Sequence, residues 1–404
     1  MILLVGVSVR ALMESAAESG YEAMGIDYFG DIDACRQGKT MNLTVDYGVR
    51  PTVKNLLEVA KNVSCRSLIY ASGPENAPEQ LDYWEERGLL KGNGVSVLRK
   101  VRNPRELRRS LGQVGAKMPG FCSVKEWRYP PNRKRWLLKP LNRGGGHGIL
   151  ALPEEKEDAN RLISALPDPT QYIIQEFMSG IPGSVSFLAN GQKAVVLGTS
   201  RQLIGSRGKE RPFLYEGNIV PLDLRGMMNP KDFEKEITKM VQHITKDFGL
   251  KGINTLDFIV NRDGIWVLEV NPRWSASVEL IEKALGERLF ACHLAACNGA
   301  DLEGMTDLLK RIQTANTHTF WGKRVVYAPE SGVIVQCDGN QLEYLYRQGV
   351  RDIPRKDTKI EKGQPICSVL TSGATDRHCE LRLGVKAKWA GQFFGQCGVM
   401  AVAR

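Results

Sequence analysis

Three polar residues alternate at the end of an apolar stretch, in the segment LEVNPRWSASVE at residues 268–279. Glu269, Asn271 and Arg273 are spaced two apart, so in a β-strand they project to one face while the residues between them project to the other. Carboxylate and amide oxygens suit Mg²⁺, and an arginine can bind a phosphoryl or carboxylate oxygen through two parallel hydrogen bonds. The alternative is a strand end whose polar side chains simply face water.

A β-hairpin would position this row. The sequence INTLDFIVNRDGIWVLEVNPR contains two apolar strands that flank Asn261–Gly264, a turn-forming tetrad. Pairing across the turn can bring Asp257 of the first strand onto the same face as Glu269 and Asn271. The sequence therefore predicts a magnesium site, made of Asp257, Glu269 and Asn271, that also holds substrate phosphates.

A second motif is the glycine-rich loop NRGGGHGI at residues 142–149, which follows a predicted strand holding Lys139. Glycines let backbone N–H groups close over a polyanion, and the lysine adds a point charge for a phosphate. The loop is not a P-loop, because Ile149 follows its last glycine where that motif needs Lys-Ser or Lys-Thr. An ordinary hairpin loop is the alternative interpretation.

Length and composition describe a globular protein of two or three domains. The chain has 404 residues, of which 42% are hydrophobic and 25% charged. No apolar run approaches the roughly 20 residues that cross a bilayer. The N-terminus has no basic leading segment and reads as a first strand, so we expect a cytoplasmic protein with no membrane partner. Nine scattered cysteines without a CxxC pair agree with this location.

The net charge of +10 favours acidic partners such as nucleotides, polycarboxylates or nucleic acid. Nucleic acid is disfavoured because no recognition helix, zinc finger or aromatic RNA-binding strand accompanies the charge. The basic segment RQLIGSRGKERPFLYEGN offers Arg201, Arg207 and Arg211 as contacts for an acidic substrate, with a solvated loop as the alternative. The sequence leaves open whether the chain forms a homo-oligomer.

Strand-like and helix-like segments alternate over residues 1–98, which predicts a parallel sheet covered on both faces. Ligands of such sheets bind beyond the carboxyl ends of the strands, here near Ser8, Asp27 and Ser72. The fingerprint G-x-G-x-x-G is absent, which disfavours a nicotinamide or flavin.

We expect a second domain over residues 99–312 and a third over residues 313–404. The second has a helix entered at Asn103–Pro104 and a long helix that ends on Gly249. The third consists of glycine-broken segments, including HCELRLGVKAKWA, which we expect to be strands of a small β-rich domain.

The order of these motifs resembles the ATP-grasp superfamily over roughly residues 1 to 310. A glycine loop preceded by a lysine, the strand IIQEFMSG, and then Asp257 followed by LEVNPR occur in the family's order and spacing. The resemblance implies an α/β fold in which an N-terminal parallel-sheet domain precedes a two-lobed α+β domain that holds ATP between its lobes.

The resemblance also implies roles for individual residues. Lys139 and Arg273 would act at the transferred phosphate, and Mg²⁺ or Mn²⁺ would be held by Asp257, Glu269 and Asn271. Backbone groups near Met178 would recognise adenine. The nucleotide would be bound by Lys139, by the loop residues Gly144, Gly145, Gly146 and Gly148, by the interlobe segment Gln175, Glu176, Phe177 and Met178, and by Ser184.

Two positions depart from the family pattern. Where many members have a further phosphate-binding lysine upstream of the loop, this chain has VRNPREL, so that role is unfilled or passes to Arg105. The acid that often binds the ribose is also missing, and the segment GIPGSVSF offers Ser184 and Ser186 instead.

The N-terminal segment VGVSVRALMESAAESGYEAMGIDYFGDID resembles a subgroup of carboxylate–amine ligases related to biotin carboxylase, which includes tyramine–glutamate ligase and a methylornithine–lysine ligase. The resemblance implies an enzyme that uses ATP to join a carboxylic acid to an amine through an acyl phosphate, in the synthesis of a cofactor or amino-acid derivative. The alternatives are an enzyme that phosphorylates bicarbonate and a non-catalytic nucleotide-binding protein.

Overall fold

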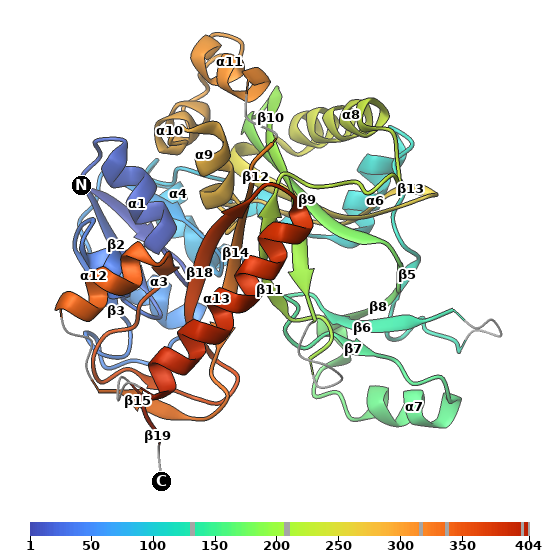
Figure 1. Ribbon diagram of the computed structural model, residues 1–404. Helices are drawn as coiled ribbons and strands as arrows, with labels where there is room; N and C mark the ends of the chain where they lie inside the picture. Colours follow the sequence, from blue (N-terminus) through green and yellow to red (C-terminus); the bar gives the residue numbers. More distant parts are fainter. Residues whose placement is uncertain (130–133, 206–210, 315–317, 336–338, 397–399, 403–404) are drawn as a thin grey trace.

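The computed structural model describes residues 1–404 except 130–133, 206–210, 315–317, 336–338, 397–399 and 403–404. In Figure 1 the N-terminal region lies at the left, a large twisted sheet crosses the middle, and a small lobe lies at the lower right. The predicted α/β fold, with an N-terminal parallel sheet and a two-lobed centre, is confirmed. The domain boundaries after residues 98 and 312 stay predictions.

The N-terminal region contains the predicted parallel sheet, with strand order β3-β2-β1-β4. Its strands are short apolar runs, and Leu3, Val5 and Ile26 are completely buried among them. The ordered segments are β1 (Ile2–Val5), α1 (Arg10–Glu18), β2 (Ala23–Asp27), α2 (Ile32–Cys35), β3 (Thr40–Asn42), α3 (Val53–Lys61), β4 (Ser67–Tyr70), the 3-10 helices η1 (Pro74–Asn76) and η2 (Pro78–Leu81), α4 (Asp82–Glu85) and α5 (Val95–Val101).

A helix and a small antiparallel sheet follow. The helix α6 (Pro104–Gly112) begins where predicted, because the Asn103 side chain accepts hydrogen bonds from the backbone N–H groups of Arg105 and Glu106. The sheet has the order β5-β8-β6-β7, and the glycine loop joins β6 to β7. This small lobe contains β5 (Phe121–Ser123), β6 (Trp136–Pro140), β7 (Leu150–Ala151), α7 (Lys156–Ser164), η3 (Pro169–Gln171) and β8 (Tyr172–Glu176).

The central sheet has eight strands in the order β13-β12-β9-β10-β11-β14-β18-β16. The predicted hairpin is its β12–β13 pair, and the predicted long helix is α8, which ends at Gly249 in the left-handed conformation. The segments up to residue 314 are β9 (Ile181–Asn190), β10 (Ala194–Ile204), β11 (Tyr215–Val220), α8 (Pro230–Phe248), β12 (Lys251–Asn261), β13 (Gly264–Asn271), α9 (Val278–Leu285), α10 (Phe290–Cys297) and α11 (Thr306–Thr314).

The two faces of the central sheet have different coverings. Leu256 and Phe258 point to the face that packs against α8. Ile253 points to the opposite face, which packs against α9 and α10. Because side chains alternate along β12, Asp257 lies on the α9 side of the sheet.

The last region of the chain continues the central sheet. Its strands β14, β18 and β16 extend that sheet, whereas β15, β17 and β19 form a separate small one. The segments are β14 (Phe320–Tyr327), β15 (Gly332–Ile334), α12 (Gly339–Arg347), β16 (Val350–Arg351), β17 (Lys359–Ile360), β18 (Pro365–Gly373), α13 (Asp376–Gln396) and β19 (Met400–Val402).

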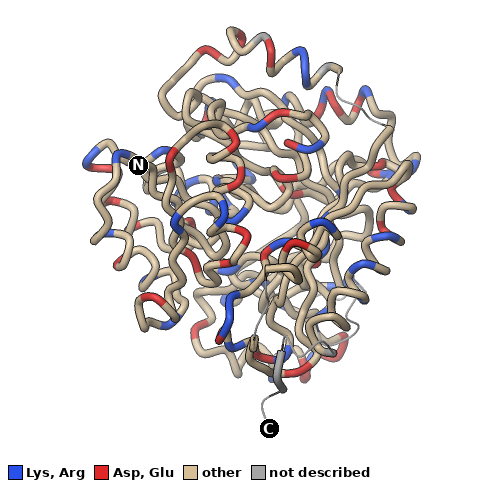
Figure 2. The backbone as a smooth tube through the Cα atoms, turned by 60° about the vertical axis from the view of Figure 1, so that its left-hand side comes forward, with Lys and Arg blue, Asp and Glu red and all other residues tan. Residues whose placement is uncertain are grey.

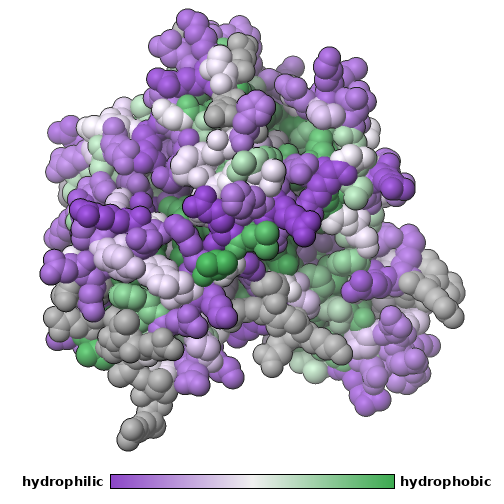
Figure 3. All heavy atoms as spheres, in the orientation of Figure 1, coloured by the Kyte–Doolittle hydropathy of each residue, from purple (hydrophilic) through white to green (hydrophobic). Residues whose placement is uncertain are grey.

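The expectation that HCELRLGVKAKWA forms strands is wrong, because this segment lies in the helix α13. Its buried residues Cys379, Leu383, Ala390 and Phe394 are spaced at helical intervals, and this period outweighs the glycines that suggested strand breaks. The helix covers β14 and β18, and in Figure 1 it crosses the front of the molecule. Figure 3 shows that this front face is mainly hydrophilic, with a small apolar patch near its centre.

Charged residues are distributed over the whole fold. In the view of Figure 2, basic and acidic positions are interspersed along the described backbone, with no large region of one sign. None of the helices in the described residues has the length and apolar character that a membrane span requires.

A buried ion network joins the N-terminal region to the central sheet. Arg10 of α1 is 1% exposed and binds both carboxylate oxygens of Glu279, at 2.6 and 2.7 Å. Its Nε also donates to Asp352 at 2.9 Å. Lys323 of β14 lies 3.1 Å from both acids, so two cations compensate the same two carboxylates. These charges lower the pKa of Glu279 even though its burial acts in the opposite direction.

Replacing Arg10 by Met should destabilise the fold by about 3–5 kcal/mol, because it leaves buried carboxylates with too little positive charge. Urea denaturation would measure the loss. Arg99→Met removes an exposed ion pair with Glu79 and should change stability little. Equal stabilities of the two variants would contradict the importance of the buried network.

Candidate active site

The hairpin brings the predicted metal-binding residues together. Asp257 of β12 is paired with Glu269 of β13, and the Asn271 side chain donates to the carboxylate of Asp257 at 2.9 Å. The pairing register shifts just after Asp257, and such an irregularity redirects a side chain locally. The polar row predicted from the sequence is therefore a compact cluster on one face.

The two carboxylates of this cluster repel each other. Burial and the negative charge of Glu269 raise the pKa of Asp257 to about 7, although Arg273 and Lys139 act in the opposite direction. Burial would also raise the pKa of Glu269, but the positive charges of Lys139, Arg102 and Arg273 hold it below its ordinary value. A divalent cation would relieve this repulsion, and the hard oxygen donors of Asp257, Glu269 and Asn271 suit Mg²⁺.

The described residues contain no group of three or more His, Cys, Asp or Glu side chains arranged to hold a metal. A cation at the hairpin would therefore be held by two carboxylates and one amide and would complete its shell with oxygens of a ligand or water. Lys139 Nζ lies 2.6 Å from Glu269 Oε2, so the lysine would have to release this carboxylate oxygen to a bound cation.

The glycine loop lies against the start of β11. Three of its glycines have positive φ, and the carbonyl of Gly145 accepts a hydrogen bond from the Tyr215 backbone N–H at 3.0 Å. A Cβ atom on Gly146 would lie 1.8 Å from the Phe213 carbonyl oxygen, so only glycine allows this approach. Burial and the nearby charges of Arg211 and Arg143 lower the pKa of His147. The charges of two arginines therefore act at the loop, and positive charge of this kind favours a bound phosphate.

The predicted interlobe segment leaves the small lobe at the end of β8. The backbone N–H groups of Glu176 and Phe177 donate to the carbonyls of Gly120 and Arg135, at 2.7 and 2.9 Å. Arg135 also lies over the Phe177 ring, 4.3 Å from its centroid. These contacts fix Gln175, Glu176 and Phe177 to the small lobe, while the adenine contact near Met178 stays a prediction.

Ser184 belongs to a polar row on the same face as Asp257, with which it is paired in the sheet. Its hydroxyl lies 2.7 Å from that of Ser200, which accepts a hydrogen bond from Asn218 at 2.9 Å. Ser186 makes similar hydroxyl contacts with Thr255 and Ser277. A ribose contact of Ser184 stays a prediction.

Arg273 joins the hairpin to the N-terminal region. Its Nε donates to Glu75 at 3.0 Å, and one terminal nitrogen donates to Asn271 at 3.2 Å. Glu75 is 4% exposed and follows β4, at the edge of the parallel sheet where a ligand was expected. Sequence reasoning missed Glu75, and its position next to that edge, close to Ser72, is the signal that could have found it.

Arg102 is a second residue that sequence reasoning missed. One terminal nitrogen donates to the Leu141 carbonyl at 3.2 Å, just before the glycine loop, and the other is buried without a hydrogen-bond partner in the described structure. The charge of Arg102 also lowers the pKa of Glu269. Arg105, which the sequence suggested for the missing lysine, is 66% exposed and binds Glu126 instead.

Comparisons with known proteins agree with this geometry. Residues 101–277 match the family model described as an ATP-grasp domain. The chain contains an ATP-grasp domain. It includes the hairpin, the glycine loop and the interlobe segment, so the resemblance inferred from these motifs is confirmed.

Related sequences cover different shares of the chain. An uncharacterized protein of Methanocaldococcus jannaschii is 22% identical over 91% of this chain and 87% of its own length. D-alanine–D-alanine ligase of Fusobacterium nucleatum is 26% identical over 65% of this chain and 81% of its own length. The arginine-specific carbamoyl phosphate synthase large chain of Bacillus subtilis is 20% identical over 73% of this chain, which spans only 30% of that protein.

Solved structures have the same fold over almost the whole chain. L-amino acid ligase from Bacillus licheniformis superimposes with a TM-score of 0.67 and 17% identity, covering 96% of both chains. Biotin carboxylase from Campylobacter jejuni gives a TM-score of 0.68 with 12% identity, covering 100% of this chain and 92% of that one. The three regions of this protein are thus arranged as in those structures.

Of the three arginines predicted to meet an acidic substrate, the two that the structure describes lie in different places. Arg201 is adjacent to Gln202, which contacts Asp257, so Arg201 points to the opposite face of β10, where it binds Asp376 and Glu380. Arg207 lies outside the described residues. Arg211 lies near the ATP-grasp glycine loop and donates to the Gly363 carbonyl at 3.0 Å.

We expect Gly146→Ala to weaken MgATP binding by about tenfold, which corresponds to about 1.4 kcal/mol. The added methyl group would collide with the Phe213 carbonyl and prevent the loop from lying against β11. Calorimetric titration would measure the affinity. Gly144→Ala is the matched control, because a Cβ there meets nothing within 4 Å, and it should bind MgATP normally.

Arg102→Gln should weaken MgATP binding by about 10- to 100-fold, because we expect the free terminal nitrogen of Arg102 to donate a charge-assisted hydrogen bond to a phosphate oxygen. Arg105→Gln should leave the affinity unchanged, because Arg105 is bound to Glu126 at the surface. The same titration compares both variants, and a loss confined to Arg105→Gln would reverse the assignment.

Proposed function

We propose that the protein is an ATP-dependent carboxylate–amine ligase that forms an amide and releases ADP and phosphate. The observation that carries this proposal is the position of Arg273. It contacts Asn271 of the carboxylate cluster on one side and Glu75 at the ligand-binding edge of the N-terminal sheet on the other. A group transferred from ATP would thus be passed to an acceptor at that edge.

Carboxylates need such activation because their oxygen is a poor leaving group. An oxygen of the acid attacks the γ-phosphorus of ATP, the bond to the β-phosphate oxygen breaks, and ADP leaves. The amine nitrogen then attacks the acyl carbon and loses a proton, and phosphate departs with the oxygen that came from the acid. The protein's task is to hold the reactants together and to neutralise charge.

Each charged group of the site has a role in this scheme. Lys139 and the glycine loop hold the phosphates, and Arg102 takes the place of the missing upstream lysine. Arg273 steadies the oxygens of the transferred phosphoryl group. Asp257, Glu269 and Asn271 would hold Mg²⁺ or Mn²⁺, which would offset the negative charge of the phosphates.

The acid would lie at the carboxyl edge of the parallel sheet, near Ser8 and Ser72. Among the described residues Arg211 at the glycine loop is the substrate candidate, since Arg201 faces away from the ATP-grasp site. The names of two relatives, D-alanine–D-alanine ligase and L-amino acid ligase, support amide formation from a small acid and a small amine. Synthesis of a cofactor or amino-acid derivative is the kind of pathway that such a reaction serves.

Oxygen transfer tests the mechanism directly. With an acid substrate labelled with ¹⁸O in its carboxylate, we expect one labelled atom in inorganic phosphate for each amide formed, with ADP as the other product. The substrate pair would first be found by measuring ADP release over a matrix of acids and amines. Mass spectrometry of the phosphate provides the readout.

Other label distributions would identify other reactions. Label in AMP with release of pyrophosphate would mean adenylation, and phosphate oxygen drawn from water would mean simple ATP hydrolysis. ADP release that depends on bicarbonate would indicate a bicarbonate-phosphorylating enzyme. Nucleotide binding without turnover under all conditions would indicate a binding protein.

A further inference from the structure

Glu75 holds Arg273 from outside the ATP-grasp hairpin. The two residues are 198 positions apart in sequence, yet the Arg273 Nε lies 3.0 Å from Glu75 Oε1. Both side chains are largely removed from water, with Glu75 4% and Arg273 11% exposed. In such surroundings an ion pair is screened little, so the contact restrains the direction of the guanidinium group strongly.

Glu75 itself is fixed to the N-terminal sheet. Its second oxygen accepts the backbone N–H of Gly73 at 2.5 Å. Gly73 has a φ of +122°, and its backbone is held between β4 and η1. Both oxygens of Glu75 are therefore used in positioning, one toward its own loop and one toward Arg273.

The hydrogen bonds of Arg273 leave two N–H groups of its guanidinium for a ligand. Within the described part of the chain, three of its five N–H groups have partners: Glu75, the Trp274 carbonyl at 3.3 Å and Asn271 at 3.2 Å. The Nε contact is the shortest of the three and the only one to a charged group. The two other N–H groups can meet the oxygens of a substrate or a phosphoryl group.

We propose that Glu75 is the positioning residue for Arg273, so that Arg273 is correctly directed only when the N-terminal region is docked on the ATP-grasp domain. This inference rests on the proposed function for its kinetic consequence. The contact fixes the proposed acid-binding edge of the N-terminal sheet relative to the proposed phosphate-transfer site. Glu75 acts through Arg273 and needs no contact with the reacting atoms.

Glu75→Gln tests the kinetic consequence. The amide has nearly the same shape but lacks the charge that directs Arg273, so we expect kcat to fall by about 10- to 100-fold. The affinity for MgATP should stay within about threefold of the wild-type value, because Lys139 and the glycine loop are unchanged. Glu75→Asp keeps the charge and should recover part of kcat.

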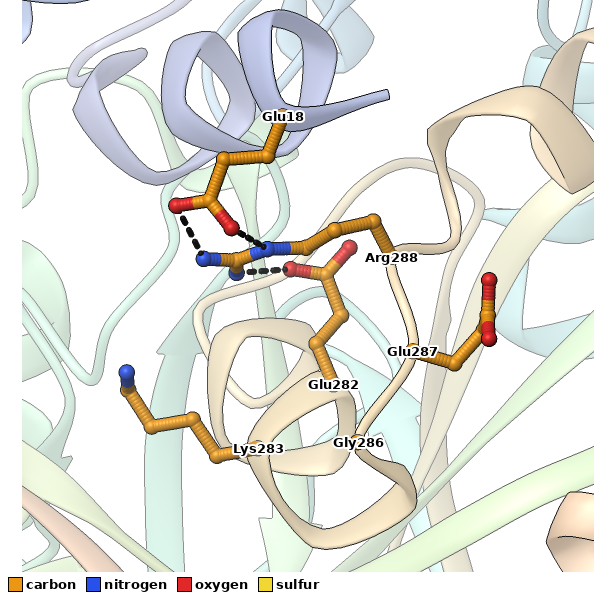
Figure 4. Close-up of a pocket in the computed structure, with 6 residues that line it drawn as sticks. All are labelled: Glu18, Glu282, Lys283, Gly286, Glu287 and Arg288. Atoms are coloured by element: carbon orange, nitrogen blue, oxygen red, sulfur yellow. Dashed lines mark hydrogen bonds and ion pairs between the residues drawn. The ribbon is translucent and has the colours of Figure 1, made fainter.

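The matched control is Glu282→Gln. Glu282 of α9 is also buried and also contacts the N-terminal region, through Ser15. It also binds Arg288 at 2.8 Å, and Arg288 in turn binds Glu18 of α1. Figure 4 shows Arg288 between Glu282 and Glu18. This variant should lower the melting temperature without changing kcat, which separates loss of stability from loss of positioning.

A double-mutant cycle with Arg273→Lys excludes an indirect effect. If Glu75 acts through Arg273, the double variant Glu75→Gln/Arg273→Lys should have a kcat within about twofold of that of Arg273→Lys alone. Fully additive losses, or wild-type kcat in Glu75→Gln, would overturn the inference while leaving the ligase activity of the wild-type protein established.

A measurement without turnover keeps the inference testable if the proposed function fails. The Nε–H signal of Arg273 in ¹⁵N-arginine-labelled protein can be assigned by its loss in Arg273→Lys. We expect slow hydrogen exchange at this group in the wild type and an increase of about tenfold or more in Glu75→Gln, which corresponds to about 1.4 kcal/mol or more of lost protection. Unchanged exchange would overturn the positioning role.

Discussion

The repulsion between the carboxylates of Asp257 and Glu269 is the constraint on which the site depends. The hairpin register places them side by side, and the pKa of Asp257 rises to about 7 through burial and the charge of Glu269. Such a pair is stable only with compensating groups, which here come from three separate parts of the chain. Lys139 comes from the small lobe and Arg102 from the junction between α5 and α6, while Arg273 follows the hairpin itself.

A second balance of buried charge holds the N-terminal region in place. Arg10 and Lys323 share the carboxylates of Glu279 and Asp352, and loss of either cation would leave buried negative charge without enough compensation. Glu279 belongs to α9, which begins only five residues after Arg273. Docking of the N-terminal region therefore restrains Arg273 in two ways. It supplies the partner Glu75, and it holds α9, which closely follows Arg273 in the chain.

The fold and the local motifs could be predicted because they depend on neighbours in sequence. The alternation of apolar residues in β12 and β13, the turn at Asn261–Gly264 and the cap at Asn103 each specify their own structure within a few residues. The helix α13 was missed because the segment HCELRLGVKAKWA, which contains Gly384, was read as a strand broken by glycine, although its buried residues follow the helical period. Here the spacing of apolar residues was a better guide than the glycines.

The site was only partly predictable, because its remaining members depend on contacts between distant segments. The position of Glu75 close to Ser72 suggests the ligand-binding edge of the sheet, but only the fold reveals that it contacts Arg273. Arg102 and Arg105 are both arginines in the segment where a phosphate-binding lysine is missing, so the sequence cannot choose between them. In the fold Arg105 binds Glu126 at the surface, whereas the charge of Arg102 acts on Glu269. Arg201 illustrates the opposite error, since a one-residue step along β10 puts its side chain on the far face from Gln202. In each case the role of a charged residue depends on the partner that the fold places next to it. The role is hardest to predict from sequence where that partner comes from a distant region of the chain.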